Sequence, residues 1–514
     1  MEIIKKYYSQ FSEFTFFLYI LGIMSFGRIF AIKHFMVSKI PMFVTEIVLF
    51  ICCPYVFMNY HKLLKLPKVF IFAAGGFFSL GIFHLISGLL SGNLFALRDS
   101  VLSIYMVFIL ISYLVFLKPD NFKNFLKILI IGNMLAMVVF KYFLFLAVYQ
   151  SIGDINKFIS CSNLSDLKGF NFGIYSNIFI AFIFSFCGML KKNINKILMF
   201  LLLSLNIYTV VSMASRSTVI AFIANIIFFL LVLRGRYLKL MIAYFLTSLI
   251  LVGFSYYVDF NVEKISSYKK HGSRLTSIVT LFKSILTIDR KAQTINIDCA
   301  QKLCVGESVD QIENGLKSYP EWARKKTFAT EYMKKILKAQ DNLKYISQNE
   351  AYGNAYWRMV VGVQAVEFGL QAPILGKGFG VYPDYRLANN QKMTELNKEK
   401  FALYSQVISP HNHIITVLMK MGFVGLALFL FINIYAFVVG LELMKKCNNV
   451  FIRQYVMAVL GSFVSWHVLA LLFDVIDAPM TNMFLWIFLG MIFAIRTHID
   501  DNSANKGFQY ETKF

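Results

Sequence analysis

The chain of 514 residues carries 51 Lys and Arg against 28 Asp and Glu, which gives a formal net charge of +23. Only 15% of its residues are charged and 58% are hydrophobic, whereas soluble proteins have about 25% charged and roughly 45–50% apolar residues. This composition excludes an ordinary soluble domain. The Lys and Arg residues stand in short clusters between apolar runs, a pattern that sets membrane orientation and requires no nucleic-acid partner.

Twelve apolar stretches follow one another along the chain, each long enough to cross about 30 Å of hydrocarbon. They lie near residues 14–32, 41–59, 67–90, 99–117, 125–148, 171–190, 195–213, 216–233, 237–257, 421–442, 451–473 and 480–496. No small-residue cleavage site follows the first stretch, so we expect a retained span. The sequence therefore predicts an all-α polytopic membrane protein of about twelve transmembrane helices.

Basic clusters occupy every second connection between these stretches. They are Lys62/Lys65/Lys68, Lys118/Lys123/Lys127, Lys191/Lys192/Lys196, Arg234/Arg236/Lys239 and Lys445/Lys446/Arg453, with Lys5/Lys6 and Arg496 on the same side. The other short connections carry fewer cations, Lys33 and Lys39 being the main exception. Because cytoplasmic loops are enriched in Lys and Arg, we expect both termini in the cytoplasm.

This orientation predicts four parts. Helices 1–9 fill 1–257, one large extracytoplasmic loop between helices 9 and 10 fills 258–410, helices 10–12 fill 411–497, and a cytoplasmic tail fills 498–514. The loop lies where no ATP is available, so a reaction on that side needs a substrate that arrives already activated.

The large loop has features of its own. Residues 321–349 are rich in Lys and carry Phe328, Tyr332 and Ile336 at helical spacing. This segment is either an amphipathic helix on anionic lipid headgroups or a solvated helix packed on the loop. Cys299 and Cys304 are either a local disulfide on an oxidising side or two free thiols.

Arg216 follows Ser215 in the predicted turn between two spans on the outer face. Ser215 or Ser217 can cap the helix that begins there. A helix N-terminus has free N–H groups and about half a positive charge, which already favours an anion. Arg216 is therefore a candidate anion-binding residue, the alternative being an interfacial arginine that snorkels.

Arg358 lies in NAYWRMVVGVQAVEFGL, where Gly362, Ala365 and Gly369 would share one face of a helix with it. A smooth stripe beneath an arginine lets another helix or a lipid tail approach closely. Ordinary helix packing beside a surface arginine is the alternative.

The segment Ser409-Pro410-His411-Asn412-His413 has the pattern of a helix start, with Ser409 as the N-cap and Pro410 in the first helical position. A histidine there lies near the positive helix end, which disfavours the imidazolium and suits a neutral base. A zinc site would need a third ligand, and the sequence predicts no metal.

The run Gly376-Lys377-Gly378-Phe379-Gly380 lacks the Lys-Ser/Thr pair that opens a P-loop helix, so we interpret it as a flexible turn. Asp474 and Asp477 are three positions apart and more typical of a helix end than of a metal site.

Three segments together resemble the shared domain of O-antigen ligases and O-antigen polymerases. They are Ser215-Arg216 before STVIAFIANIIFFLL, Arg358 before AVEFGLQAPILGKGFGVY, and His411-Asn412 before HIITVLMKMGFVGLALFL. The Pro, Gly-x-Gly and Gly-x-x-Gly positions of the family pattern are filled by Pro373, Gly376, Gly378, Gly422 and Gly425. Each piece is weak alone, and the order and spacing of all three make the combination specific.

The resemblance implies a GT-C-like membrane fold in the bacterial inner membrane, a role in lipopolysaccharide biosynthesis, and an active site facing the periplasm. The donor would be a glycan on undecaprenyl diphosphate, and the acceptor either lipid A-core or another lipid-linked repeat unit. Arg274, in GSRLTSI, resembles a further family arginine, and Arg358 with Gly369 fits an Arg-x10-Gly pattern.

Glycosyl transfer from a diphosphate needs charge neutralised on the leaving group and a proton removed from the acceptor hydroxyl. We therefore expect Arg216, Arg358 and Arg274 to bind the diphosphate and His411 to act as the base, supported by Asn412, His413 and Gly369. Several arginines can replace a metal ion in this role, so no cofactor is predicted.

Two other classes of protein compete with this interpretation. A lipid-linked glycan flippase would need charges near the middle of several spans, and Glu46, His84, Lys141 and His467 are the candidates. A scaffold or sensor with an extracytoplasmic domain is the third. Ligase and polymerase stay open, with the single large loop before the tenth span slightly favouring a ligase.

Overall fold

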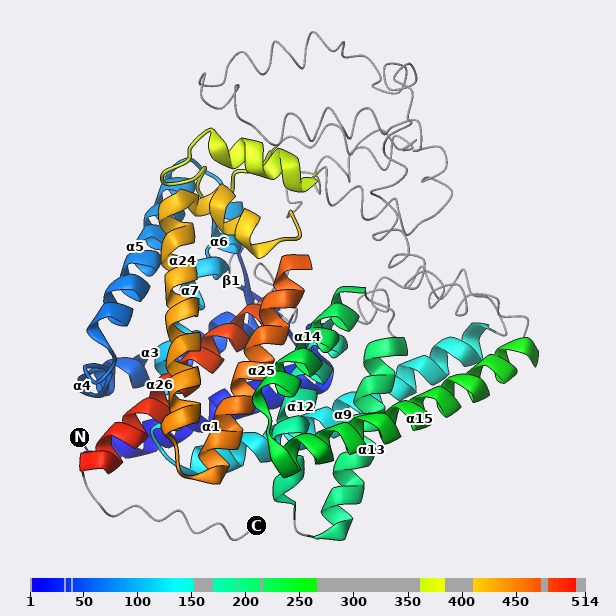
Figure 1. Ribbon diagram of the computed structural model, residues 1–514. Helices are drawn as coiled ribbons and strands as arrows, with labels where there is room; N and C mark the ends of the chain where they lie inside the picture. The colour runs from blue at the N-terminus through cyan, green and yellow to red at the C-terminus, as the bar shows by residue number, and fades with distance from the viewer. Residues whose placement is uncertain are drawn as a thin grey trace, which may run out of the picture. The chain divides into compact units, whose positions relative to one another are not determined.

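The computed structural model describes residues 2–31, 34–37, 40–151, 170–190, 192–212, 216–265, 361–383, 410–472 and 479–504 (Figure 1). These residues form helices, short connections and one β-hairpin. The chain divides into two compact units, each treated by itself below. Unit 1 contains Met1–Phe78, Val101–Lys269 and Leu430–Phe514, and unit 2 contains Ser79–Ser100 and Lys270–Phe429.

The elements in chain order are α1 (Glu2–Phe26), α2 (Arg28–Ala31), β1 (His34–Val37), β2 (Ile40–Phe43), α3 (Val44–Met58), α4 (Tyr60–Leu63), α5 (Lys68–Leu90), α6 (Phe95–Asp99), α7 (Val101–Ile104), α8 (Val107–Phe116), α9 (Asp120–Ser151), α12 (Phe170–Phe186), η1 (Cys187–Met189), α13 (Asn193–Ser212), α14 (Arg216–Val232), α15 (Gly235–Ile265), α24 (His413–Lys446), α25 (Val450–Leu472) and α26 (Pro479–Ala504). A further helix spans Val361–Leu370.

Each of the twelve predicted apolar stretches coincides with helix, which confirms an all-α polytopic membrane protein. Among the described residues, 7 helices are long and apolar enough to cross a membrane, by length and composition. They are Lys68–Leu90, Phe95–Phe116, Asp120–Val139, Asn193–Val210, His413–Lys446, Val450–Leu472 and Thr481–Asp501. Five shorter apolar helices accompany them, and the number of spans stays a prediction.

The β-hairpin occupies part of the stretch predicted as the second span. β1 pairs antiparallel with β2, with His34 opposite Phe43 and Val37 opposite Ile40. Pro41 has no N–H to donate and disfavours helical backbone at the residue before it. The helix α3 therefore begins at Val44, three residues later than the sequence pattern predicted.

In unit 1, α8 and α26 approach closely where α26 has a glycine. A Cβ added to Gly490 would lie 2.5 Å from the Ile109 carbonyl oxygen and would also collide with the Ser112 hydroxyl. Small residues let membrane helices come into backbone contact, where packing rather than hydrophobicity holds them together.

An aromatic cluster joins α9, α12 and α25 in unit 1. The Tyr455 ring meets the Phe122 ring at 4.9 Å and 81°, and the Phe182 ring at 5.5 Å and 86°. Edge-to-face pairs of this kind add roughly 0.5–1.5 kcal/mol each beyond the area that they bury. They give the three helices a fixed rotation about their axes.

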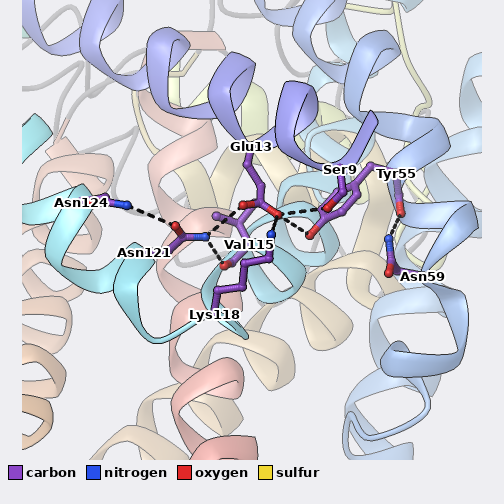
Figure 2. Close-up of polar contacts among 8 residues, drawn as sticks. All are labelled: Ser9, Glu13, Tyr55, Asn59, Val115, Lys118, Asn121 and Asn124. Carbon is purple, nitrogen blue, oxygen red and sulfur yellow. Dashed lines mark hydrogen bonds and ion pairs between the residues drawn. The ribbon is translucent and has the colours of Figure 1, made fainter. Parts of the chain in front are cut away.

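A buried carboxylate links the middle of α1 to α3 and to the start of α9 (Figure 2). Glu13 accepts from Lys118 at 2.5 Å, from the Tyr55 hydroxyl at 3.3 Å and from the Asn121 amide at 3.4 Å. An ionised side chain leaves water at little cost only when it is paired and hydrogen-bonded. Lys118 belongs to a predicted cytoplasmic cluster, and here one member of that cluster also holds three helices together.

Candidate active site

The chain breaks the helical backbone of α24 at Gly422, where φ is 65° and ψ is −166°. This divides α24 into a short arm, 413–421, and a span segment, 423–446. Two carbonyls at the end of the short arm lose their helical partners. The N–H of Lys377 donates to the Met419 carbonyl at 2.9 Å, and the N–H of Gly378 donates to the Lys420 carbonyl at 3.0 Å.

The other side of the break is satisfied by the same segment. The N–H of Phe423 donates to the Pro373 carbonyl at 2.7 Å, and the N–H of Val424 donates to the Ile374 carbonyl at 3.1 Å. Irregular backbone at a membrane helix is tolerated only where its polar groups find partners. The segment 373–378 supplies those partners, so the break and this segment form one structural feature.

Glycine is required at the break by both backbone angles and space. A Cβ on Gly422 would lie 2.5 Å from the Gly376 nitrogen, and one on Gly376 would lie 2.5 Å from the Gly422 nitrogen. The two backbones are therefore in direct contact. The sequence pattern had marked both glycines, and their contact gives the physical reason for them.

We expect Gly422→Ala to lower the unfolding temperature of the purified protein. The backbone angles at Gly422 are nearly exclusive to glycine and cost a side chain about 1–3 kcal/mol, before any clash with the neighbouring backbone. Gly75→Ala is the matched control, because a Cβ there meets nothing within 4 Å and alanine in a helix gains roughly 0.5–1 kcal/mol. Equal unfolding temperatures for both variants would contradict this account of the break.

The Gly turn, residues 376–380, was predicted as a flexible turn; a turn is found, and side chains hold its backbone. Gly376, Gly378 and Gly380 all have positive φ, at 80°, 88° and 80°. Both backbone groups of Gly380 are held by side chains: its N–H donates to Asp99 at 2.8 Å and its carbonyl accepts from Asn93 at 2.6 Å. The turn is therefore held by hydrogen bonds to the N–H and to the carbonyl of Gly380. The spacing of residues in the sequence does not reveal these bonds.

His84 of α5 lies against the same turn. Its ring centroid is 5.6 Å from that of Phe379, and its Nδ1 would be 3.3 Å from a Cβ at Gly378. His84 was named above as a candidate for a translocation pathway. In the structure its ring packs against Phe379 and Gly378 of the Gly turn.

A buried ion pair lies beneath the turn. Lys420 Nζ is 2.9 Å from Asp99 Oδ1, and the two side chains are 0% and 1% exposed. The Tyr382 hydroxyl also donates to Asp99 Oδ1, and Lys420 lies over the Tyr382 ring at 5.4 Å. Neither charged residue was predicted as part of the site. A lone lysine inside the apolar run HIITVLMKMGFVGL was the signal that could have found Lys420.

The helix Val361–Leu370 packs on the short arm along its small-residue stripe. A Cβ on Gly369 would lie 3.0 Å from the Met419 Cα, one on Gly362 would lie 3.6 Å from the Ile415 side chain, and Ala365 is fully buried. The predicted stripe of small residues is therefore the surface against which the short arm packs. Burial raises the pKa of Glu367 on the same helix, and Arg358 lies outside the described residues.

The start of α24 differs from the prediction by three residues. The helix begins at His413, and the Asn412 side chain is its cap: Oδ1 accepts from the N–H of Ile414 at 3.0 Å and of Ile415 at 3.2 Å. Pro410 lies before the helix and Ser409 lies outside the described residues. Asn412 replaces serine as the cap because its carbonyl oxygen reaches two orphan N–H groups at once.

His411 precedes this cap in an unusual backbone conformation. Its φ is 52°, so it is the one residue other than glycine with positive φ in the described part of the chain. Such conformations gather at functional sites, where the surrounding structure holds them. The other histidine of this segment, His413, is the first residue of the helix. Its side chain is buried, with 3% exposed, and its ring lies 5.7 Å from the ring of Phe429.

We expect Asn412→Ala to destabilise the short arm by about 0.5–2 kcal/mol, since it leaves two N–H groups without their acceptor. Asn412→Asp keeps a side-chain oxygen in the same place and should restore the loss. Thermal unfolding of the two variants measures the difference. A cap without structural importance would give both variants the wild-type unfolding temperature.

The predicted arginines are only partly covered by the structure. Arg216 is the first residue of α14, as predicted, so Ser217 lies inside that helix and is not its cap. Nothing is described for the Arg216 side chain, and Ser215, Arg274, Cys299, Cys304 and Asp474 lie outside the described residues. Among the described residues, no three His, Cys, Asp or Glu side chains gather into a metal site.

Residues 197–430 match the model of a protein family described as O-antigen ligase. This segment is similar to the O-antigen ligase domain. The resemblance predicted from three motifs is thereby confirmed over that part of the chain. No match to a curated protein is found.

The O-antigen ligase domain contains the helix Val361–Leu370, the Gly turn, the short arm and His411. Members of this family are glycosyltransferase-like enzymes, and the match supports a ligase- or polymerase-type function. Asp99, Asn93 and His84 lie outside the matched segment yet hold the Gly turn of the domain.

Proposed function

We propose that this protein is a membrane glycosyltransferase that moves a glycan from an undecaprenyl-diphosphate donor to an acceptor sugar hydroxyl. The proposed site is at the outer face of the bacterial inner membrane. The O-antigen ligase match over residues 197–430 is the observation that carries the proposal. The alternation of basic clusters along the chain supports the orientation.

In the proposed reaction, the acceptor hydroxyl oxygen attacks the anomeric carbon of the donor from the face opposite the diphosphate. The new glycosidic bond forms as the bond from that carbon to the diphosphate oxygen breaks, and its electron pair leaves with the diphosphate. Direct attack inverts the anomeric carbon. The hydroxyl proton passes to the neutral imidazole of His411, for which a positioned histidine contributes roughly 10²–10⁴-fold.

Arg216, Arg358 and Arg274 are proposed to hold the diphosphate. A guanidinium grips two phosphate oxygens at once, and each charge-assisted hydrogen bond contributes about 1.5–3 kcal/mol. The charge that develops on the leaving group is then stabilised by these arginines without a metal ion. The start of α14 at Arg216 supports its part in this, because a helix N-terminus also favours an anion.

Support for His411 comes from its surroundings in unit 2. Its positive φ fixes the backbone, and the Asn412 cap fixes the helix that follows. Gly369 allows the helix after Arg358 to pack on the short arm. The two helices run in the same direction, because Gly362 faces Ile415 and Gly369 faces Met419. Their first residues, Val361 and His413, therefore lie toward the same end of the pair, and Arg358 and His411 precede them in the sequence.

We propose the ligase reaction, with lipid A-core as the acceptor, over the polymerase reaction, with a lipid-linked repeat unit. The predicted single large loop before the tenth span supports this choice. Surface-glycan electrophoresis of a deletion strain is the test. A ligase predicts loss of all capped lipid A with accumulation of lipid-linked polymer.

The other outcomes of this test are equally distinct. A single repeat unit left on the core would identify a polymerase instead. Repeat units retained on the cytoplasmic side would identify a lipid-linked glycan flippase and would overturn a transferase function. Unchanged surface glycan and unchanged lipid-linked intermediates would overturn all three.

A further inference from the structure

We infer that Asp99 is a positioning residue for glycan transfer: its carboxylate fixes the Gly turn and, through it, the short arm that follows His411. The effect on transfer rests on the proposed function. The effect on the turn does not, because it follows from contacts within unit 2.

The Asp99 carboxylate accepts hydrogen bonds from three donors, which belong to two segments of the chain. Oδ2 accepts from the N–H of Gly380 at 2.8 Å, and Oδ1 accepts from Lys420 Nζ at 2.9 Å and from the Tyr382 hydroxyl. Asp99 is 2% exposed. A buried carboxylate with three donors is held in one place, so it can serve as a rigid reference point.

Both backbone polar groups of Gly380 are held by one stretch of chain, residues 93–99. Asp99 accepts from its N–H, and Asn93, six positions earlier, donates to its carbonyl. The backbone also passes very close to that stretch, since a Cβ on Gly380 would lie 2.8 Å from the Asn93 Cγ and 2.9 Å from the Ala96 nitrogen. The Gly turn therefore has one position relative to residues 93–99.

The Gly turn in turn fixes the position of the short arm through backbone hydrogen bonds. Lys377 and Gly378 donate their N–H groups to the Met419 and Lys420 carbonyls, which close the last turn of the arm. Lys420 then binds Asp99 directly. The arm begins at the Asn412 cap, immediately after His411, so its far end is fixed by Asp99 and its near end is adjacent to the proposed base.

Asp99 has no expected contact with the donor diphosphate. It is buried, and its charge is balanced by Lys420. Loosening the turn should therefore lower the turnover rate and leave the affinity for donor nearly unchanged. The alternative is that Asp99 serves only to balance the charge of Lys420. In that case, removing both charges together would leave turnover unchanged.

Two double variants separate these roles. Asp99→Asn/Lys420→Met and Asp99→Leu/Lys420→Met both remove the charge pair. Asparagine keeps an oxygen that can accept from the Gly380 N–H, whereas leucine of similar size has none. The pair is thus matched in charge and differs in the one hydrogen bond that the inference concerns.

The measurements use the full-length protein in lipid nanodiscs. Amide hydrogen exchange over 371–383 reports on the turn, thermal unfolding reports on the fold, and turnover and donor binding are measured with a lipid-diphosphate-linked glycan. In the leucine variant we expect roughly tenfold or faster exchange across the turn, because a buried N–H loses its acceptor. We expect turnover to fall by a similar factor, with donor affinity within about threefold. The double variant with asparagine should stay close to wild type in amide exchange, turnover and donor affinity.

Equal exchange and equal turnover in the two double variants would overturn the inference. If the leucine variant does not fold, Asn93→Asp tests the clamp instead. It keeps the oxygen that accepts from the Phe95 N–H at 3.0 Å and loses the donor to Gly380, so faster exchange at the turn is expected with the ion pair intact. Failure of the proposed function would appear as a wild-type protein without transfer while the exchange difference remains.

Discussion

Replacing His411 with alanine is expected to lower the rate of glycan transfer by about 10²–10⁴-fold, the contribution of a positioned general base. The imidazole takes the proton of the acceptor hydroxyl as the new glycosidic bond forms. Initial rates of transfer from a lipid-diphosphate-linked glycan measure this loss.

His61→Ala is the matched control for this substitution. His61 is an exposed histidine in α4, and its removal should leave the rate unchanged. Donor affinity should survive His411→Ala, because the arginines are proposed to bind the diphosphate. A His411→Ala protein that transfers glycan within a few-fold of wild type would remove His411 as the base.

Lys420→Met is expected to reduce the free energy of unfolding by about 3–5 kcal/mol, since it leaves the buried Asp99 carboxylate without its counter-charge. The double variant Asp99→Asn/Lys420→Met should lose much less. Replacing both members of a buried pair removes the desolvation cost together with the attraction. Together with the wild type, the single variants Asp99→Asn and Lys420→Met and the double variant form a cycle that measures the coupling between the two residues.

An exposed pair supplies the comparison. Lys65 Nζ lies 2.7 Å from Asp501 Oδ2, with both side chains more than half exposed at 54% and 55%. Lys65→Met should cost about 1 kcal/mol or less, because water screens such pairs. The free energies of unfolding of Lys420→Met and Lys65→Met, measured in the same detergent, give this comparison. A Lys420→Met protein as stable as Lys65→Met would show that the buried pair is not held as the structure indicates.

The helical architecture could be predicted because it depends on local composition. A run of apolar residues must satisfy its own backbone polar groups in lipid, and a helix does so within the run. Every predicted stretch is accordingly helical, and the errors lie at ends, as where Pro41 turns the start of the second stretch into a strand. The caps show the same limit: the sequence pattern located the helix start near His411 but assigned the wrong cap.

The break in α24 shows what local composition cannot reveal. Gly422 lies in an apolar run that continues past it, and hydropathy does not distinguish a straight helix from an arm and a span. The break exists because segment 373–378 supplies hydrogen-bond partners on both sides of it. The sequence pattern marked the glycines of both segments without predicting that they are in contact.

By itself, the sequence determined the membrane class, the helices and the resemblance to a family over part of the chain, because hydrophobic runs and the order of motifs can be recognised along the sequence alone. The tertiary structure alone decided that Asp99, Gly380 and Lys420 meet, across sequence separations of 281 and 321 positions. The meeting depends on how buried charges and orphan backbone groups find partners. That is a property of the folded chain, since such partners are chosen by burial in three dimensions and leave no periodic trace in the residues between them.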